Sequence, residues 1–527
     1  MLIHKPTNSL IFEHKDPQEV LKHIPCARTV EYKGRTLTQV RFHYDEMAVL
    51  RNIGVYAPSP IRTDYTWPRN PSLVPMPYNH QIDTADFFTM NRRCICLNGM
   101  GTGKTLAAAW AADYLMNIGK VTRAIIVTPK STLHSAWGDT LLTHFLSHRR
   151  TTVLTGSRKR RLDLLAIPSD FYVINHDGLK VIQEELEKRK DINLWILDEA
   201  AEGWRNAQTE RYKLTKRLLR PGDWVWLMTG TPTPTAPTDA WALAKLINSP
   251  TVPKYFNAFR ESVMMKINDF KWIPRNGAMD TVYSILQPGI RFRKADCLQL
   301  PPVTFVDVAC ELTAEQERVY AEMQRHLISV ADSGEQLVAA NAAVKLVKLL
   351  QIACGHVYAS SGAIADLDCS ERLEALETLI ASTENKAIVF VPFTHSLNAV
   401  ATHLRKRWKV EVVDGSVSDG KRKQIFSDFQ NQDDPKVLVA HPKTTAHGLT
   451  LTRADLTVWY APIFMPEIFE QANNRMDRPG QKNNMTVAML AATAMERRIY
   501  ASLRAQCIMQ QTLLDMYSDL RNTGQIQ

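Results

Sequence analysis

The 527-residue sequence lacks the cysteine spacing of zinc-binding and disulfide-rich domains. Its eight cysteines are scattered, and no pair of C-x-x-C clusters is present. A structural zinc site is therefore not expected. Cys94 and Cys96 alternate with apolar residues in RRCICLNG, and we interpret them as small buried residues of a strand rather than as metal ligands or a redox pair.

The sequence also lacks any apolar run near the roughly 20 residues that a membrane-spanning helix requires. No secretory signal pattern precedes MLIHKPTNSL, and no internal repeat or low-complexity tract stands out. These features argue against a membrane-spanning protein and lead us to expect an intracellular, soluble globular protein.

Acidic residues are in deficit. The chain has 64 Lys and Arg against 54 Asp and Glu, which gives a net charge of +10 and a pI near 9.1. A basic balance favours a polyanionic partner, nucleic acid before an anionic membrane. A basic solvated surface explains the same numbers equally well, so charge alone does not settle the partner.

The length exceeds that of one ordinary core and predicts several domains. Residues 1–74 have short alternating runs such as RTVEYKGRTLTQVRF, which predict strands around a Lys33–Gly34 turn in a small α+β module. A proline-rich passage then leads to an α/β domain over 75–250. Helical insertions and a linker are expected over 251–368, a second α/β domain over 369–500, and a C-terminal helix over 501–527.

Both predicted α/β domains show compact apolar runs that alternate with helical stretches, a pattern typical of buried parallel strands. The first series is CICL, AIIVTP, FYVIN, LWILDEA and VWLMTGTP; the second is KAIVFV, KVEVVDG, KVLVAH, LTVWYAP and MTVAML. Between them, TAEQERVYAEMQRHLISV and LVAANAAVKLVKLLQIA have apolar residues at helical spacing. The terminal helix is expected to place Ile499, Leu503, Leu514 and Tyr517 on one face.

The stretch NGMGTGKT, 98–105, lies between a predicted strand and an alanine-rich helix. Such a loop lets backbone N–H groups approach phosphates, with a lysine reaching the β- and γ-phosphates and a threonine hydroxyl on Mg²⁺. The pattern therefore predicts an ATP-binding loop formed by Gly99, Met100, Gly101, Thr102, Gly103, Lys104 and Thr105. A flexible glycine turn that happens to precede Lys-Thr is the alternative.

The run LWILDEA predicts a strand that ends in Asp198 and Glu199. Phosphoryl transfer needs a carboxylate for Mg²⁺ and a group that orients the attacking water. We expect Asp198, with Thr105, to hold Mg²⁺ and Glu199 to orient the water. An isolated Asp-Glu pair is more often a helix N-terminus or a solvated surface, but its place after a buried strand and downstream of the loop favours catalysis.

Five segments occur in the order of superfamily-two helicase motors: GMGTGKT, DEAAEGWRN, LMTGTP, HGLTLTRAD and QANNRMDRPGQ. The set most resembles the Swi/Snf family of double-stranded DNA translocases over about 77–500. PYNHQ resembles the adenine-reading Q motif, VTPKSTLHSAW resembles a strand and loop that contact a DNA backbone, and FRKADCLQLPP followed by ELTAEQERVY resembles the link between lobes. That family carries an acidic residue where Asn98 stands, so the missing first glycine fits this branch.

The resemblance implies two tandem RecA-like lobes and assigns roles to individual residues. Gln81 would bind adenine, and Gly448 would bring the backbone close to nucleotide or DNA. Thr229, Gly230 and Thr231, with Gln471, would couple the nucleotide to DNA. Arg475 and Arg478 would be arginine fingers on the γ-phosphate, although their i, i+3 spacing alone is typical of a helix surface. The implied DNA contacts are Lys130, Ser131, Trp137, Arg205, His441, Lys443 and Thr444. For Trp137, packing is the commoner alternative.

The sequence departs from the family at three positions. Ala201 replaces the histidine of the D-E-x-H motif, Thr450 replaces an asparagine, and Ala461 replaces an acidic residue. We therefore expect a divergent phage or bacterial member that keeps hydrolysis, in a prokaryotic or phage-infected cytoplasm; coupling between the site and Thr229–Thr231 stays open. The N-terminal module loosely resembles an accessory module of annealing helicases, where it would recognise branched DNA; a packing or protein-docking role is an equal alternative.

The expected function is ATP-driven movement along double-stranded or branched DNA that remodels DNA or bound proteins. A strand-separating helicase uses the same motor motifs and stays open as an alternative. A DNA-binding scaffold with structural nucleotide would not need Glu199. An RNA motor is less favoured because the best motif match is to the duplex-DNA branch.

Overall fold

The computed structural model describes residues 1–32, 34–67, 76–268, 271–332, 339–358, 364–445 and 450–505. The chain divides into two compact units, one built on Met1–Cys297 and the other beginning at Leu298. This boundary differs from the predicted division, in which 251–368 was a separate region. The insertions up to 297 belong to the first unit, and the segment from 298 onward belongs to the second.

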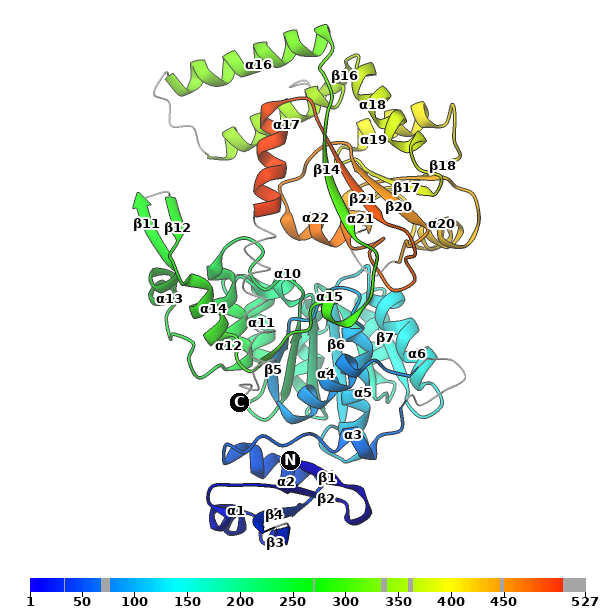
Figure 1. The fold of residues 1–527 in the computed structure, drawn as a ribbon. Coiled ribbons are helices and arrows are strands. Elements are labelled where there is room, and N and C mark those ends of the chain that lie inside the picture. Colours follow the sequence, from blue (N-terminus) through cyan, green and yellow to red (C-terminus); the bar gives the residue numbers. More distant parts are fainter. Residues whose placement is uncertain are drawn as a thin grey trace. The chain divides into compact units, whose positions relative to one another are not determined.

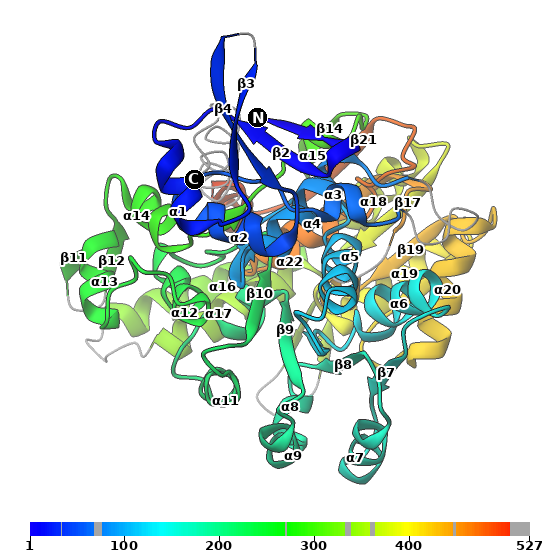
Figure 2. The same cartoon turned by 90° about the horizontal axis from the view of Figure 1, so that it is seen from below.

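The N-terminal module of the first unit is a four-stranded antiparallel sheet in the order β1-β2-β4-β3. Its strands are β1 (Leu2–His4), β2 (Ser9–Phe12), β3 (Arg28–Tyr32) and β4 (Arg35–Arg41), and its helices are α1 (Pro17–His23) and α2 (Tyr44–Asn52). Figure 2 shows the β3–β4 hairpin extending beyond the rest of this sheet. The predicted α+β module and its hairpin are confirmed, although Lys33 lies outside the described residues.

The module has its own apolar core and is also tied to the α/β domain that follows. Leu10, Val40 and Phe42 are completely buried within it. Arg51 Nη2 and Arg62 both contact the carboxylate of Asp86, which is 2% exposed. Burial of this carboxylate is compensated by the two guanidinium groups, so the module and the next domain share one ion-pair network.

Seven described strands of the first unit form a fully parallel sheet in the order β13-β5-β10-β9-β6-β8-β7. The strands are β5 (Arg93–Cys96), β6 (Arg123–Thr128), β7 (Thr151–Leu154), β8 (Phe171–Asn175), β9 (Ile192–Asp198), β10 (Trp224–Met228) and β13 (Gly289–Ile290). The helices are α3 (Ile61–Asp64), α4 (Asn79–Met90), α5 (Lys104–Asn117), α6 (Asp139–Phe145), α7 (Arg158–Ala166), α8 (Gly178–Val181), α9 (Gln183–Lys188), α10 (Ala200–Trp204), α11 (Glu210–Leu218), α12 (Ala240–Ile247), α13 (Phe256–Val263), α14 (Ala278–Ile285) and α15 (Lys294–Cys297). A hairpin of β11 (Met264–Asn268) and β12 (Lys271–Pro274) follows α13.

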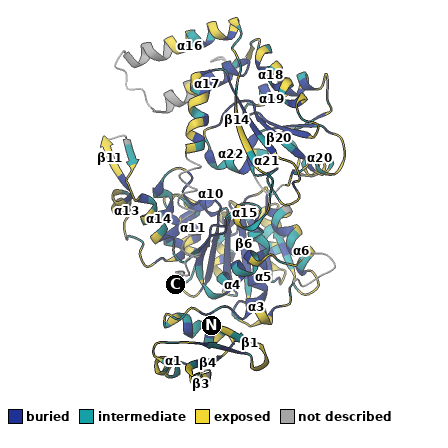
Figure 3. Cartoon of the chain, viewed as in Figure 1, coloured by how far each residue is buried: buried dark blue, intermediate teal, exposed yellow. Residues whose placement is uncertain are grey.

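Helices cover both faces of this sheet (Figure 1), which explains why its strands are apolar throughout. In β9, Leu194 and Ile196 face a core with α4, α5 and α6, whereas Trp195 and Leu197 face a core with α10 to α14. Figure 3 shows the central strands buried and the outer helix surfaces exposed. The five strands predicted here are confirmed.

The second unit contains a fully parallel sheet of six described strands in the order β14-β21-β20-β17-β19-β18. The strands are β14 (Val303–Ala309), β17 (Lys386–Phe390), β18 (Val410–Val413), β19 (Val437–Ala440), β20 (Ala454–Trp459) and β21 (Met485–Ala491). The helices are α16 (Ala314–Asp332), α17 (Ala339–Ala353), α18 (Ser370–Ala381), α19 (Thr394–Leu404), α20 (Asp419–Asn431), α21 (Pro442–Thr445) and α22 (Pro466–Asn473). A small hairpin of β15 (His356–Tyr358) and β16 (Ile364–Asp366) follows α17.

The second sheet is also covered on both faces. Val389 and Val439 pack with α18 and α19, whereas Phe390 packs with α20, α22 and the helix over 494–505. All five predicted strands of this domain are confirmed, as are the predicted helices α16 and α17. Two tandem doubly wound parallel lobes with an N-terminal module are therefore present as expected. Leu514 and Tyr517 of the predicted terminal helix lie outside the described residues.

Candidate active site

The loop between β5 and α5 has a backbone that favours glycine at two positions. Gly101 has a φ of +78° and Gly103 a φ of +81°, a region in which side chains are strained. A Cβ added at Gly103 would also lie 2.0 Å from Nε2 of Gln81. The loop leads into a helix of 14 residues with no acidic residue in its first turn. The N-terminus of α5 is therefore suited to bind an anion.

Lys104, the first residue of α5, donates from Nζ to the carbonyl oxygens of Asn98 and Gly99 at 2.8 and 3.3 Å. The Thr102 hydroxyl donates to the same Gly99 oxygen at 2.8 Å, and Thr105 is the second residue of the helix. The predicted loop residues thus form one compact turn. The ammonium group that we expect to bind phosphate interacts with backbone carbonyls of its own loop.

Asn98 anchors the loop with both ends of its amide. Its Nδ2 donates to Thr84 Oγ1 of α4 at 2.8 Å, and its Oδ1 accepts from the backbone N–H of Phe292 at 2.9 Å. The side chain is 1% exposed. Asn98 therefore connects the loop to α4 and to the segment after β13, a role that needs a donor and an acceptor together.

Gln81 lies in the first turn of α4, directly against the loop. Its Nε2 donates to Thr102 O at 3.4 Å, and its Oε1 accepts from Tyr78 N at 3.0 Å. His80 Nε2 donates to the same Thr102 oxygen at 2.8 Å, and its ring stacks on Tyr78 at a centroid distance of 5.6 Å. The structure thus brings Gln81 to the nucleotide loop, while its contact with adenine stays a prediction.

Asp198 and Glu199 stand at the carboxyl end of β9. Asp198 Oδ2 accepts from Trp137 Nε1 at 2.8 Å and from Thr128 Oγ1 at 3.1 Å, and Oδ1 accepts from Glu199 N at 3.1 Å. Burial, reinforced by the Glu199 charge, raises the pKa of Asp198 to about 6, while the Trp137 donor and Lys104 oppose this shift. The carboxylate is thus buried within the electrostatic reach of the loop lysine.

Trp137 corrects one of the predicted DNA contacts. The side chain is completely buried and its indole N–H is bonded to Asp198. A residue in this position has no face on which a base could stack, so the expectation of a DNA contact is wrong for Trp137. Its observed role is to orient the buried carboxylate.

The order of the sheet places the end of β10 beside both elements. Thr229 N donates to Cys96 O at 3.0 Å, and Thr231 N donates to Thr229 Oγ1 at 3.2 Å. A Cβ added at Gly230 would lie 3.7 Å from Met100 Cε. Thr229 and Thr231 are both buried. The predicted coupling segment therefore touches the nucleotide loop directly.

Ala201 occupies the position of the absent motif histidine. It is 3% exposed within the core between the sheet and α10 to α14. The methyl group packs among apolar neighbours and offers no polar atom. Any coupling from this part of the chain must come from another residue.

The predicted residues of the second unit lie on and around α21 and α22. Arg475 is 3% exposed, and its carbonyl accepts from Leu451 N at 2.9 Å. Arg478 donates from Nη1 to Thr450 Oγ1 at 3.3 Å and from Nε to Asn474 O at 3.3 Å. Gln471 is buried on α22. Gly448 lies outside the described residues, and Ala461 is buried.

The remaining candidate DNA contacts follow strand ends. Lys130 and Ser131 are exposed after β6, and Arg205 is half-buried after α10. In the second unit, Lys443 is exposed on α21, which begins directly after His441. The Thr444 hydroxyl already donates a hydrogen bond within the protein, to His441 O at 2.7 Å. These positions are compatible with backbone contacts, which stay a prediction.

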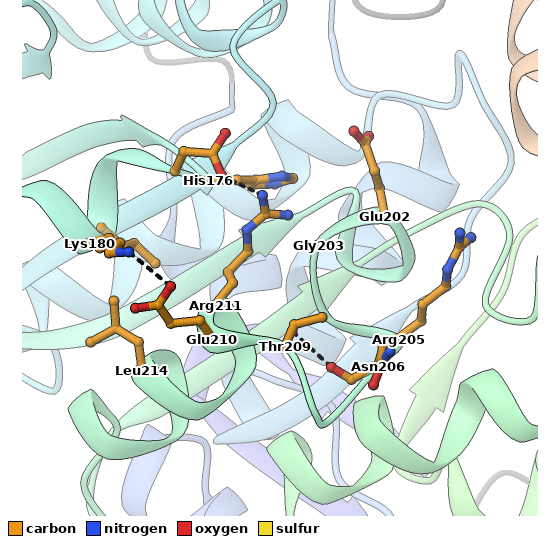
Figure 4. Close-up of a pocket in the computed structure, with 12 residues that line it drawn as sticks. His176, Lys180, Glu202, Gly203, Arg205, Asn206, Thr209, Glu210, Arg211 and Leu214 are labelled. Carbon is orange, nitrogen blue, oxygen red and sulfur yellow. Dashed lines mark hydrogen bonds and ion pairs between the residues drawn. The ribbon is translucent and has the colours of Figure 1, made fainter.

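Sequence reasoning missed His176, which follows β8. Its backbone N–H donates to Thr128 O at 3.0 Å, and its Nε2 donates to Asp198 O at 3.0 Å. His176 also lines a pocket of about 500 Å³ bounded by α8, α10 and α11 (Figure 4). The signal was a histidine directly after the buried run FYVIN, but the adjacency of β8, β6 and β9 was needed to interpret it.

Among the described residues, no group of three or more His, Cys, Asp and Glu side chains could hold a metal ion. A carboxylate beside a phosphate loop nevertheless fits Mg²⁺, which usually takes one or two carboxylates together with substrate phosphates and water. Asp198 is buried, and a bound cation would stabilise its ionised form. In the portion of the chain that the structure describes, no helix has the length and apolar character to cross a membrane.

Several known proteins are similar to this chain. Putative protein p41 of Acyrthosiphon pisum secondary endosymbiont phage 1 is 24% identical over 72% of this chain and 83% of its own length. The DNA repair and recombination protein RAD54-like of Gallus gallus is 23% identical over 77% of this chain and 62% of its own length, so this chain spans less than two thirds of that relative. The solved structure of the Sulfolobus solfataricus SWI2/SNF2 ATPase core in complex with dsDNA is 21% identical, with 86% of this chain and 96% of that chain covered and a TM-score of 0.41.

Two family models match in succession. Residues 39–359 match the SNF2-related domain, and residues 371–480 match the helicase conserved C-terminal domain. The first match alone covers more than half of the chain, and both lobes have the parallel sheets that such domains require. The chain therefore belongs to the SNF2-related family of helicase-like ATPases.

Proposed function

We propose that the chain hydrolyses ATP when it binds duplex DNA and uses the reaction to move along the double helix. The observation that carries the proposal is the acid pair at the carboxyl end of β9, at the same sheet edge as the glycine loop that follows β5. A nucleotide-binding scaffold would need the loop but not a second acid. Asp198 and Glu199 together fit a site that hydrolyses what it binds.

Within this proposal each residue has a distinct task. Thr105 and Asp198 would hold Mg²⁺, which when bound neutralises charge on the nucleotide phosphates. Lys104 would exchange its two carbonyl partners for phosphate oxygens. Glu199 would orient the attacking water, and Gln81 would bind adenine from its position against the loop.

Arg475 and Arg478, which belong to the second unit, would act as arginine fingers on the γ-phosphate. A guanidinium group suits this role because it is planar and always charged. Movement would follow if Lys130, Ser131 and Arg205 on one lobe and His441, Lys443 and Thr444 on the other gripped DNA alternately. The family membership, the net charge of +10 and a relative named for DNA repair and recombination support DNA as the partner.

The test is the ATPase rate of the full chain with single-stranded, duplex and branched DNA and with RNA. We expect duplex or branched DNA to stimulate hydrolysis most, and Lys104→Ala to abolish it. A rate that no nucleic acid changes would contradict the DNA-driven motor. Displacement of a triplex-forming strand measures movement along duplex DNA, and unwinding of a forked duplex without such displacement would replace the translocase by a strand-separating helicase.

A further inference from the structure

The backbone of Glu199 adopts an unfavourable conformation. Glu199 has φ of 47° and ψ of 52°, the left-handed region that residues with a side chain rarely occupy. Such a conformation persists only where the surroundings hold it. The position of the Glu199 carboxylate therefore depends on the contacts that fix this peptide.

Two hydrogen bonds hold the backbone around the acid pair. The Glu199 N–H donates to Asp198 Oδ1 at 3.1 Å, and the Asp198 carbonyl accepts from His176 Nε2 at 3.0 Å. Both polar atoms of the peptide that joins the acids are thus fixed by side chains. Because a carbonyl can only accept, the His176 ring must carry its proton on Nε2 for this bond.

His176 is itself rigidly placed. The residue is 6% exposed, and its backbone is tied to the end of β6 through Thr128 O. Its ring packs edge-on against Trp204 of α10 at a centroid distance of 4.8 Å. A Cβ added at Gly203 would lie only 3.4 Å from the ring. The imidazole thus fits between the strand ends and α10.

We propose that His176 is a positioning residue for ATP hydrolysis: it fixes the Asp198 carbonyl and thereby holds Glu199 in the conformation that orients water. This inference rests on the proposed role of Glu199. His176 is expected to stay outside the nucleotide contacts, since its ring bonds the Asp198 carbonyl and packs on Trp204 of α10. Its loss should lower turnover without weakening ATP binding.

The pocket beside His176 is lined by residues of α8, α10 and α11 (Figure 4). Lys180 of α8 pairs with Glu210 of α11 at 2.9 Å, and Arg211 pairs with Asp177 at 2.5 Å. The loop that carries His176 is thus braced against α11. His176 lines the pocket but is only 6% exposed, so thermal unfolding is measured beside turnover to separate a local effect from a loss of folding.

The experiment compares His176→Leu, which removes the donor at similar volume, with His176→Gln, which keeps an N–H donor at similar reach. The matched control is His80→Leu. His80 is also 6% exposed and also donates from Nε2 to a backbone carbonyl, but to Thr102 of the nucleotide loop. Steady-state ATPase rates, fluorescent-ATP affinity and thermal unfolding are measured for all three full-length variants.

We expect His176→Leu to lower kcat by roughly 10–100-fold, the range for loss of a hydrogen-bond partner behind a metal ligand, with KM and ATP affinity unchanged. His176→Gln should recover most of the lost kcat, and His80→Leu should instead weaken ATP binding. Normal kcat in His176→Leu, a parallel loss of ATP affinity, or failure of the glutamine to restore turnover would each overturn the inference. Glu199→Gln separates the two proposals: full turnover in that variant defeats the role of Glu199, whereas an inactive Glu199→Gln beside an active His176→Leu defeats only the role of His176.

Discussion

Asp198→Asn should stabilise the nucleotide-free protein while it abolishes ATP hydrolysis. The folded-state pKa of Asp198 is raised from 3.8 to about 6 by burial and by Glu199. A carboxyl group with a raised pKa keeps its proton longer in the folded state than in the unfolded state, so stability falls as pH rises between these two values. Above about pH 6 the full cost of the ionised group is present.

The raised pKa of Asp198 sets how much the ionised carboxylate destabilises the folded protein. A difference of about 2 pKa units corresponds to ~3 kcal/mol at 1.36 kcal/mol per unit. About half of this destabilisation is already present at about pH 5. The remaining ~1.4 kcal/mol of stability should therefore be lost between about pH 5 and pH 8. The asparagine avoids the ionisation but turns an N–H donor toward Glu199 N, which costs about 1 kcal/mol at either pH. The net gain at about pH 8 is therefore ~1–2 kcal/mol.

The assay measures the free energy of unfolding of the nucleotide-free chain at about pH 5 and pH 8. A chelator is present, and the chain is unfolded by heat or by urea. Asp191→Asn is the matched control, because the hydrogen bond from Arg189 lowers the pKa of Asp191 to about 2. A lowered pKa gives stability that is fully present above 3.8, so this variant should be destabilised equally at both pH values. If Asp198→Asn shows the same pH-independent behaviour as Asp191→Asn, the reasoning about the buried carboxylate is refuted.

Two further substitutions test the electrostatics of each lobe. Trp137→Phe removes a hydrogen-bond donor that lowers the pKa of Asp198. The acid limb of the ATPase pH profile should therefore move to higher pH, with a several-fold greater loss of activity near pH 6 than near pH 8. Equal losses at the two pH values would contradict this prediction. Arg372→Met leaves Glu496 buried without its partner, since both side chains are at most 1% exposed and pair at 2.7 Å, and thermal unfolding should report a loss of about 3–5 kcal/mol. Arg318→Met, at an exposed pair, should cost less than about 1 kcal/mol, and a similar small cost at Arg372 would contradict the expected penalty.

Most strands that the sequence predicted in the two α/β domains share one physical property: they are buried on both faces and therefore read as apolar runs. β14 escaped prediction because most of VTFVDVA is exposed at the edge of its sheet, and β13 because it has only two residues. Both edge strands lie inside the region predicted as a linker. Their omission shifted the domain boundaries, since an edge strand joins its sheet by backbone pairing that leaves little trace in the side chains.

Motif order predicted the nucleotide loop and the acid pair but not what surrounds them. Trp137 and His176 both bind Asp198, one at the carboxylate and the other at the carbonyl. Each follows a different strand, so their meeting at β9 depends on the sheet order β9-β6-β8. Periodicity identifies strands without ordering them, and a supporting shell assembled from several strand ends is therefore hidden until the sheet is known.

Asn98 shows how a residue that looks like a variation of a motif can be required by its neighbours. The Thr84 hydroxyl donates its proton to His80 O at 2.6 Å, so its oxygen can only accept a further bond. Asn98 supplies that donor from Nδ2 and uses Oδ1 for the Phe292 N–H. An aspartate in the same place would keep the second bond but set a carboxylate oxygen against the Thr84 oxygen. In this chain the amide of Asn98 at the start of the loop is required by the Thr84 hydroxyl on α4. A substitution of one of these two residues should therefore be tolerated only with a matching substitution of the other.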